Sequence, residues 1–571
     1  MSTNVNTTLA VGAVVTAAKP VDNLRTKSGT DSKSSTPANH EFDFVIVGGG
    51  TATMVLAHRL TERSDVNVLV IEAGRSSRAS RIPGSLFQLN ARNANGRTGP
   101  PLRKDVIIVN SSGPEQNFRR MLERKRHDVQ LGFSPREGAE GAEGICKRSR
   151  RSFLTKTYLA PTKERGKTGP VKIGYFGFFT TWGRAFILTC EAISIPHVPD
   201  INTSKGMFLC HRGDLVAAYL TLEVLARPNL KVVCGAQVTK IRFNDAKRAI
   251  GVEFGEKKDG PIYVAGARKE VILPAGPINT PQILLSGIRP QSELSKHSIP
   301  VIQHLPGVGQ NLADHIVFNS CFPTRPGYSA GRYYTPKNFG EQLSQLGAIA
   351  QSFDQGKGAD DDQRAAVDGG EGDVLEDSTS GEGARDVEVM VAPMVWRDHG
   401  HKKFDVPEAI TITTSVLRPT SKGTVTLKSA DPWDKPLIDP CYLATKHDVD
   451  ILVRSVKLAY QLTNTEPLKS AIDQTVKHPL LDHDLSSKSN AEIEDVIRSR
   501  AETGYHPSCT ARMAPLEDGG VVDARLRVYG VQGLRAVDAS VQPEIVSGHT
   551  TGPTIAIAER AADLIKEDLV K

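Results

Sequence analysis

The segment 41–75 has the pattern of a strand, a glycine turn, a helix and a second strand. Residues 42–47 form an almost continuous apolar run, which is typical of a parallel strand buried on both faces, and three glycines at 48–50 follow directly. Residues 51–63 alternate apolar and polar side chains at helical spacing, and a second strand is predicted over 67–71. These elements predict a βαβ unit, and therefore an α/β fold built on a parallel sheet.

The glycine run and the end of the second strand indicate a dinucleotide site. Glycines let the backbone turn tightly and approach a pyrophosphate at the positive N-terminus of the helix. Glu72 lies about 20 residues beyond Gly50, where a carboxylate accepts hydrogen bonds from a ribose diol and repels the 2′-phosphate of NADP. The third glycine position of such motifs holds Thr53, and this β-branched side chain predicts a crowded turn or a helix displaced outward.

Composition and charge restrict the remaining classes. A chain of 571 residues with 39% hydrophobic and 24% charged residues is typical of a globular protein with two large domains. The net charge of +7 is mild, and the basic clusters at 119–126 and 147–151 lack the interleaved aromatic residues of a nucleic-acid groove, so no nucleic-acid partner is expected. The 7 cysteines include no C-x-x-C pair, so neither a zinc site nor a dense disulfide framework is predicted, and no metal site is expected.

The N-terminal segment 1–41 predicts a disordered leader, because it is rich in Ser, Thr, Asn and Lys. Its one apolar patch, residues 9–18, is too short to span a membrane, and no positive residue precedes it as in a secretory signal. No other segment approaches membrane-spanning length. We therefore expect a cytoplasmic protein without a membrane span, with secretion as the alternative.

Two later regions lack regular periodicity. Residues 76–165 include an Arg-, Glu- and Gly-rich stretch with few apolar side chains, and residues 354–388 carry a surplus of Asp, Glu and Gly that predicts a flexible acidic insertion. The insertion is interpreted as a solvated surface loop or a mobile lid. Elsewhere, helices are predicted over 181–195, 214–225, 448–463 and 491–501, and strands over 169–179, 230–233, 238–243, 251–254, 270–273, 409–416 and 424–427.

Four stretches in order resemble motifs of the glucose-methanol-choline (GMC) family of FAD-dependent oxidoreductases. They are the βαβ unit, GPINTPQILLSG at 276–287, LPGVGQNLADH at 305–315, and a C-terminal block that begins with GYHPSCTARM at 504–513. Arg289 stands where the second motif usually has glycine. The C-terminal block is most similar to the fungal branch of aryl-alcohol oxidases and secondary-metabolite dehydrogenases.

The resemblance implies two catalytic histidines. His506 matches the family's catalytic histidine, whose neutral imidazole can take the hydroxyl proton of an alcohol while the carbon passes hydride to the flavin. His549 matches the second active-site position, whose side chain hydrogen-bonds the substrate oxygen and stabilises developing alkoxide charge.

The resemblance also implies FAD as the cofactor and assigns its contacts. The pyrophosphate turn is expected at Gly48, Gly50, Thr51 and Ala52, and the carboxylate that binds the ribose at Glu72. Val238 is expected to contact the adenine through its backbone. The last βα turn is expected at Asp538, Ala539 and Ser540, and the contacts with the flavin ring at Thr550 and Thr551. The protein supplies position and electrostatics, and the flavin performs the redox chemistry.

The family relationship implies two interleaved domains. An FAD-binding Rossmann-like domain with a parallel sheet is expected over 42–165, 205–315 and 504–571. An α+β substrate domain built on an antiparallel sheet is expected over 166–204 and 316–503. The active site is expected where the two domains meet.

The resulting hypothesis is an FAD-dependent alcohol dehydrogenase or oxidase. It would convert an alcohol to an aldehyde or ketone, with a small aromatic or terpenoid alcohol as substrate, oxygen or another electron acceptor, and a tailoring role in secondary metabolism. The alternative is a catalytically impaired relative that acts as a binding or vestigial protein. That alternative is motivated by residues 76–165, where the family's arginine-containing, flavin-covering loop with L-G-G-S-S has no counterpart.

Overall fold

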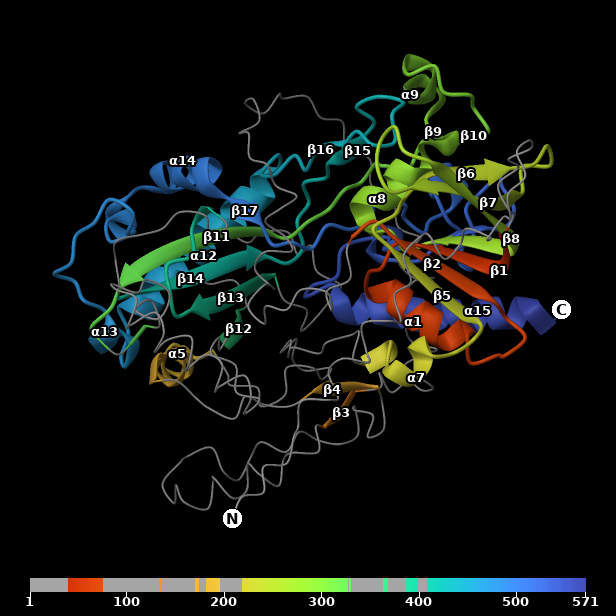
Figure 1. Ribbon diagram of the computed structural model, residues 1–571. Helices are drawn as coiled ribbons and strands as arrows, with labels where there is room; N and C mark the ends of the chain where they lie inside the picture. The colour runs from red at the N-terminus through yellow and green to blue at the C-terminus, as the bar shows by residue number, and fades with distance from the viewer. Residues whose placement is uncertain are drawn as a thin grey trace, which may run out of the picture.

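The computed structural model describes residues 40–74, 133–135, 170–173, 181–195, 218–326, 328–329, 363–367, 386–398 and 408–570. Within these ranges, two large sheets lie side by side, with the antiparallel sheet on the left of Figure 1 and the parallel-rich sheet on the right. The presence of one parallel-rich and one antiparallel sheet confirms the predicted α/β fold with a separate antiparallel sheet. The predicted leader and nearly all of residues 76–165 lie outside the described residues, as does the expected position of the flavin-covering loop.

The parallel-rich sheet is built around β1, whose apolar run is buried on both faces. Its strands follow the order β5-β2-β1-β8-β7-β6, with β18 beside the end of β8; all neighbours are parallel except β7, which runs antiparallel to β8 and β6. Val45, which is fully buried, lies between Leu69 of β2 and Val271 of β8. The strands are β1 His40–Val47, β2 Val68–Glu72, β5 Leu230–Cys234, β6 Gln237–Phe243, β7 Ala249–Gly255, β8 Ile262–Leu273 and β18 Leu534–Ala536.

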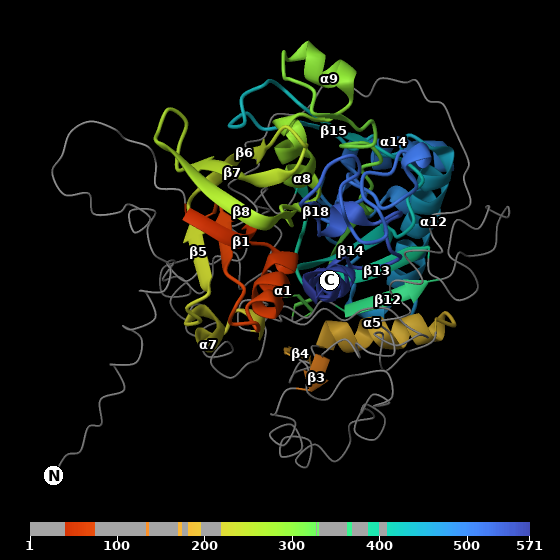
Figure 2. The same cartoon turned by 90° about the vertical axis from the view of Figure 1, so that its right-hand side faces the viewer.

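The first and last long helices pack against each other beside this sheet. Figure 2 shows α1 (Thr51–Leu60) next to the end of α15 (Thr551–Val570), below β1 and β8. Arg59 of α1 donates to Asp563 of α15 at 2.9 Å. The remaining helices of this half are α7 Leu222–Leu225, α8 Gly276–Ile283 and α9 Gln291–Lys296, with short 3-10 turns at Leu284–Ser286, Leu516–Asp518 and Ala539–Val541.

The second sheet is entirely antiparallel and has the order β12-β13-β14-β11-β17. The long helix α12 (Lys446–Thr463) packs against β14, β11 and β13, and its apolar face closes a second hydrophobic core. The other elements of this half are β11 Ile316–Pro323, β12 Gln363–Val367, β13 Val387–Ala392, β14 Ala409–Val416, β17 Glu502–Thr503, α5 Thr181–Ala192, α13 Leu468–Ala471, α14 Asn490–Arg500 and a 3-10 turn at Leu485–Ser487.

Three two-stranded sheets complete the described structure. β15 and β16 form a hairpin that approaches α8, whereas β9 with β10 and β3 with β4 are short parallel pairs. Their bounds are β3 Phe133–Pro135, β4 Val171–Ile173, β9 Ile288–Arg289, β10 Gln303–His304, β15 Thr424–Thr426 and β16 Leu437–Asp439.

Two element predictions were wrong in extent. Residues 363–367 and 387–388, placed in the flexible insertion, are strand residues of the antiparallel sheet. Each segment is hydrogen-bonded to a partner strand that is distant in the sequence, so the local acidic composition does not reveal it. The helix predicted over 214–225 is described only as a short helical turn at 218–219 and as α7.

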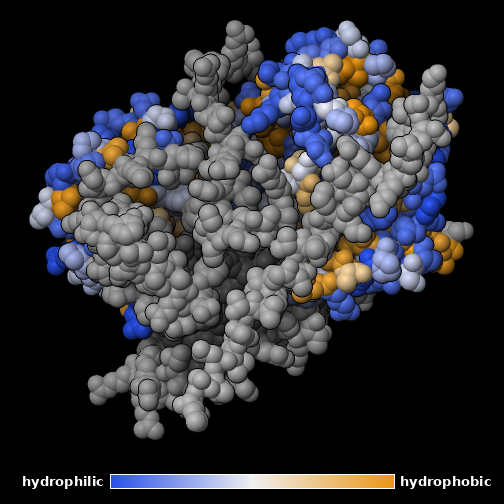
Figure 3. All heavy atoms as spheres, viewed as in Figure 1, coloured by the Kyte–Doolittle hydropathy of each residue, from blue (hydrophilic) through white to orange (hydrophobic). Residues whose placement is uncertain are grey.

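The surface of the described residues is mixed in character. On the face shown in Figure 3, hydrophobic residues occur in small groups between hydrophilic ones. Among the described residues, no helix combines the length and the apolar character needed to cross a membrane.

Candidate active site

Three histidines from distant parts of the chain form one cluster. His315 immediately precedes β11, His506 lies in the loop after β17, and His549 lies just before α15. The ring centroids of His315 and His506 are 5.0 Å apart, and those of His506 and His549 are 4.4 Å apart. The structure therefore brings together the two histidines singled out in the sequence, and it adds a third that ends the LPGVGQNLADH motif.

His315 is fully buried and uses both ring nitrogens. Its Nε2 lies 3.0 Å from the carbonyl oxygen of Val546, and its Nδ1 lies 2.9 Å from Nδ1 of His506. Burial lowers the pKa of His315 to about 4, so this imidazole is neutral near pH 7. His315 thus connects the backbone ahead of α15 to the side chain of His506.

Asp314 anchors the backbone of the His506 loop. Its Oδ1 accepts a hydrogen bond from the His506 N–H at 2.8 Å, and its Oδ2 accepts from the hydroxyls of Tyr442 and Thr503. Burial raises the pKa of Asp314, against the lowering effect of these donors. All three contacts fix the position from which the His506 ring extends.

Glu388 is the acidic partner of His549. Both carboxylate oxygens lie 3.2 Å from Nε2 of His549, and the Glu388 residue is only 8% exposed. The assignment of Glu388 to a solvated insertion was wrong, because the residue belongs to β13 and is buried against the site. No local pattern marks it, since its partner is 161 positions away.

The predicted dinucleotide turn lies between β1 and α1. Gly48 has φ +108°, and a Cβ there would lie 3.1 Å from Ala275 Cα, so the turn excludes a side chain. Gly50, the N-cap of α1, provides no side-chain cap, which leaves the first N–H groups of the helix for an anion. Thr53 is buried, and its hydroxyl donates to the Gly48 carbonyl at 2.8 Å, so the side chain at the third glycine position is hydrogen-bonded to the turn itself.

The last βα turn joins this glycine turn at the carboxyl ends of the parallel strands. Asp538 follows β18 and accepts from the Gly276 N–H at 2.8 Å, the Thr280 hydroxyl at 2.7 Å and the Ser540 N–H at 2.7 Å. Burial raises the pKa of Asp538 against the effect of these donors. Asp538 is therefore a structural brace of the turn. Two buried side chains that follow this turn in the chain have polar atoms without a hydrogen-bond partner among the described residues; they are Gln542 Oε1 and Nε2, and Ser547 Oγ.

The remaining predicted cofactor residues occupy varied positions. Glu72 ends β2 and its carboxylate accepts from the Gly74 N–H at 2.5 Å. Val238 is buried in β6 opposite Phe254, and Thr551 is the exposed first residue of α15. The others lie at the two turns and the start of the last helix; they are Thr51 and Ala52 in α1, Ala539 in the 3-10 turn and Thr550 before α15.

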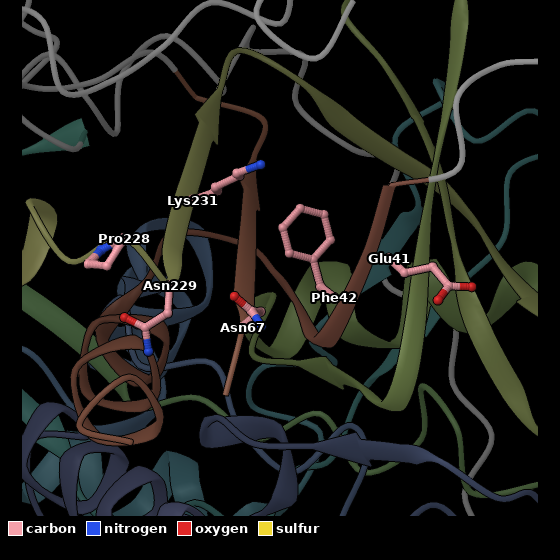
Figure 4. A pocket seen from close by; sticks show the side chains of 6 residues that line it. All are labelled: Glu41, Phe42, Asn67, Pro228, Asn229 and Lys231. Atoms are coloured by element: carbon pink, nitrogen blue, oxygen red, sulfur yellow. The ribbon is translucent and has the colours of Figure 1, made fainter. Parts of the chain in front are cut away.

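A separate cavity of about 290 Å³ lies at the opposite end of the parallel strands. Figure 4 shows Phe42 and Lys231 pointing toward it from the starts of β1 and β5, with Asn67 between them. It contains none of the clustered histidines, and it lies away from the glycine turn, which follows the end of β1. We assign it no role in the chemistry.

Comparison with known proteins identifies the family. Family models described as GMC oxidoreductase match residues 207–317 and 419–558. The dehydrogenase str4 of Strobilurus tenacellus is 33% identical, with 92% of this chain and 94% of that protein covered. The mitochondrial choline dehydrogenase of Mus musculus is also 33% identical, with coverages of 92% and 89%.

Solved structures agree on the fold. A variant of the formate oxidase of Aspergillus oryzae superposes with a TM-score of 0.74 at 22% identity, covering 93% of this chain and 98% of that one. The bare glycine turn, the open helix N-terminus and the buried polar atoms of Gln542 and Ser547 that have no partner among the described residues fit the FAD that this family binds. The chain is a member of the GMC oxidoreductase family, the FAD-dependent enzymes that oxidise CH–OH groups.

Proposed function

We propose that this enzyme oxidises its alcohol with His506 as the base and His549 as the stabiliser of the alcohol oxygen. The observation that carries the proposal is the contact between these two rings, whose centroids are 4.4 Å apart. The contact lies in a cluster that includes the buried residues His315 and Glu388. Two imidazoles at this separation can share one substrate oxygen, one by taking its proton and the other by donating a hydrogen bond to it.

The reaction balances as the loss of a proton and a hydride from one alcohol. His506 takes the hydroxyl proton, the carbon–hydrogen bond breaks with its electron pair, and the carbon–oxygen bond becomes a carbonyl. When bound, FAD supplies the acceptor for that hydride. The products are an aldehyde or ketone and a protonated His506.

His549 is suited to the second role because its Nε2 is hydrogen-bonded to a carboxylate. A carboxylate only accepts, so the proton between them belongs to Nε2 of His549, and the negative charge of Glu388 lies directly beside this ring. To donate to the alcohol oxygen as well, the ring must carry a second proton on Nδ1, and in that form it would offset the negative charge that develops as the hydroxyl proton leaves.

The proposed substrate is a small aromatic or terpenoid alcohol, and the proposed context is a tailoring step in secondary metabolism. Support comes from the relationship to the fungal dehydrogenase str4 and from the resemblance of the C-terminal block to the fungal aryl-alcohol branch. Oxygen or another acceptor would reoxidise the flavin.

The test is the replacement of His506 by alanine in the FAD-loaded enzyme. We expect the limiting rate of flavin reduction by the best alcohol of a benzylic and terpenoid panel to fall roughly 10³-fold, because the general base is lost. The measurement is flavin bleaching after anaerobic rapid mixing. His304→Ala, at an exposed histidine on β10, is the matched control and should reduce at the wild-type rate.

Unchanged flavin reduction in His506→Ala would remove the base assignment. A wild-type protein that stays colourless after incubation with FAD, or binds FAD but is reduced by no alcohol, would instead favour the catalytically impaired alternative.

A further inference from the structure

We propose that His315 is a positioning residue that fixes the tautomer of His506, holding the proton on Nδ1 and leaving Nε2 as the basic nitrogen. The inference rests on the proposed function, in which His506 is the base. It extends that function by naming the group that decides which nitrogen of His506 can accept a proton.

His315 contacts the backbone through one of its ring nitrogens. Its Nε2 lies 3.0 Å from the carbonyl oxygen of Val546. A carbonyl oxygen can only accept a hydrogen bond, so Nε2 of His315 must carry a proton. The segment that leads into α15 therefore sets the tautomer of His315.

The other ring nitrogen of His315, Nδ1, faces His506. His315 is fully buried, and burial lowers its pKa to about 4, so the ring holds one proton near pH 7 and that proton is on Nε2. Its Nδ1 is consequently a lone-pair acceptor. The titratable groups around the ring are His506, Glu388 of β13, which favours protonation of His315, and His549, which opposes it. A backbone hydrogen bond to Leu417 also favours protonation.

The tautomer of His315 in turn determines the tautomer of His506. The two Nδ1 atoms are 2.9 Å apart, and since Nδ1 of His315 accepts, Nδ1 of His506 must donate. A neutral His506 then carries its proton on Nδ1, and Nε2 has the lone pair needed by a general base. The opposite tautomer would lose the hydrogen bond and place two lone pairs against each other.

The position of the ring is held as firmly as its tautomer. The His506 N–H donates to Asp314 at 2.8 Å, and the Gly504 N–H donates to the His315 carbonyl at 2.7 Å. Residues 312–315 (LADH) are therefore hydrogen-bonded to the His506 loop through both a side chain and the backbone. A Cβ at Gly504 would lie 2.9 Å from the His315 carbonyl oxygen, which explains why this loop begins with glycine.

The experiment compares two amide replacements of His315 in the FAD-loaded enzyme. In His315→Gln the amide reaches the position of Nε2 and can donate to Val546, but no acceptor remains for His506. In His315→Asn the amide oxygen lies near the position of Nδ1 and can still accept from His506. We expect the limiting rate of flavin reduction to fall about 100-fold in His315→Gln and to stay within about 10-fold of wild type in His315→Asn.

A double-mutant cycle with His506→Ala separates positioning from general damage. If His315 acts through His506, His315→Gln should cost nothing further in the His506→Ala background. Substrate affinity and FAD content should change little, because the defect concerns proton transfer. His58→Gln is the control, since His58 also contacts a backbone carbonyl, that of Tyr219 at 2.9 Å, away from the cluster.

Equal losses in the Gln and Asn variants, a wild-type rate in His315→Gln, or an additive loss in the His506→Ala background would each overturn the proposal. If both variants fail to bind FAD, the tautomers decide: long-range proton–nitrogen spectra of histidine-labelled wild-type enzyme should show Nδ1–H on His506, and Nε2–H would refute the inference. Unchanged activity in His506→Ala would instead refute the base assignment itself.

Discussion

Arg289 is fully buried, yet its guanidinium is paired at every nitrogen. Its Nε and one terminal nitrogen bind both carboxylate oxygens of Glu293 at 2.9 and 3.1 Å, and it donates to the carbonyls of Pro281 and of Val425, the latter at 2.7 Å. Burial lowers the pKa of Arg289, opposed by Glu293. The residue that departs from the family signature is therefore a brace between α8, α9 and β15.

Replacing Arg289 by methionine should strongly destabilise the fold. The change leaves the Glu293 carboxylate without its cation and two carbonyls without a donor, and we expect a loss of roughly 3–5 kcal/mol in the free energy of unfolding. Urea denaturation followed by tryptophan fluorescence measures it. Arg268→Met is the matched control, because the Arg268 side chain is 44% exposed and its ion pair should contribute below about 1 kcal/mol. Equal losses in both variants would contradict the assignment.

The residues of the site were predictable only where a motif carried them. His506 and His549 follow from the C-terminal block, and the glycine turn follows from the βαβ pattern. His315 belongs to a quoted motif, but its role depends on a partner 191 positions away. Glu388 carries no motif, and its acidic neighbours resemble a solvated loop. Pairwise contacts over such separations leave no trace in periodicity or composition.

At the scale of elements, the predicted bounds of helices and strands were accurate where the local hydrophobic pattern was strong. The buried runs of β1, β2 and β14 and the amphipathic α12 lie within a few residues of their predicted bounds. β8 was predicted only over 270–273, because its first residues are partly exposed where they pair with β7 alone and show no clear alternation. The pairing itself, with a bulge between Phe42 and Phe44 of β1, had no sequence signal.

That bulge places Asp43 where three elements meet. Its carboxylate accepts from the Asn67 N–H at 2.8 Å and from Arg268 of β8 at 3.0 Å. Burial alone would raise the pKa of Asp43, but the hydrogen bonds and the charge of Arg268 outweigh it and lower the pKa. The ionised form is thus favoured by folding.

We expect Asp43→Asn to destabilise the enzyme in a pH-dependent way. A lowered folded pKa gives stability that is present above the unfolded pKa of about 3.9 and is lost as pH falls through the folded value. The wild type should exceed Asp43→Asn by about 0.5–1 kcal/mol near pH 7, a small figure because Arg268 is well exposed. The difference should shrink as the pH falls below about 4. Urea midpoints across this range measure it, and exposed Glu41→Gln should show no such trend.

At the scale of the whole molecule, the site is assembled from both sheets. Glu388 comes from β13 of the antiparallel sheet, whereas His549 precedes α15 of the parallel-rich half. Val425 of the β15–β16 hairpin accepts from Arg289 of β9, and the Leu427 N–H donates to Glu293 of α9. A Cβ at Gly309 would lie 2.1 Å from the Val425 carbonyl oxygen, so the close approach of these two segments requires glycine. The domain boundaries at 315–316 and 503–504 remain predictions, although β11 begins at the first and β17 ends at the second.

Glu388→Gln should slow catalysis without unfolding the enzyme. The amide can still accept from His549, but the variant lacks the negative charge beside the His549 ring, so we expect the limiting rate of flavin reduction to fall about 10- to 100-fold. FAD content and thermal midpoint should stay near wild type. Glu502→Gln, at a carboxylate that bonds Asn319 and the Asp398 N–H, is the control on the same sheet. A wild-type rate in Glu388→Gln would show that the carboxylate is not needed by His549.

The contact between α1 and α15 has a consequence for synthesis of the chain. Arg59 and Glu559 form an ion pair across 500 positions, and the apolar face of α1 is covered by the last helix of the chain. At translation rates of about 5–20 residues per second, α1 leaves the ribosome roughly 25–100 seconds before its cover is made. During that interval the β1–α1–β2 unit exposes a hydrophobic surface, so the newest protein molecules are the ones that most need a chaperone.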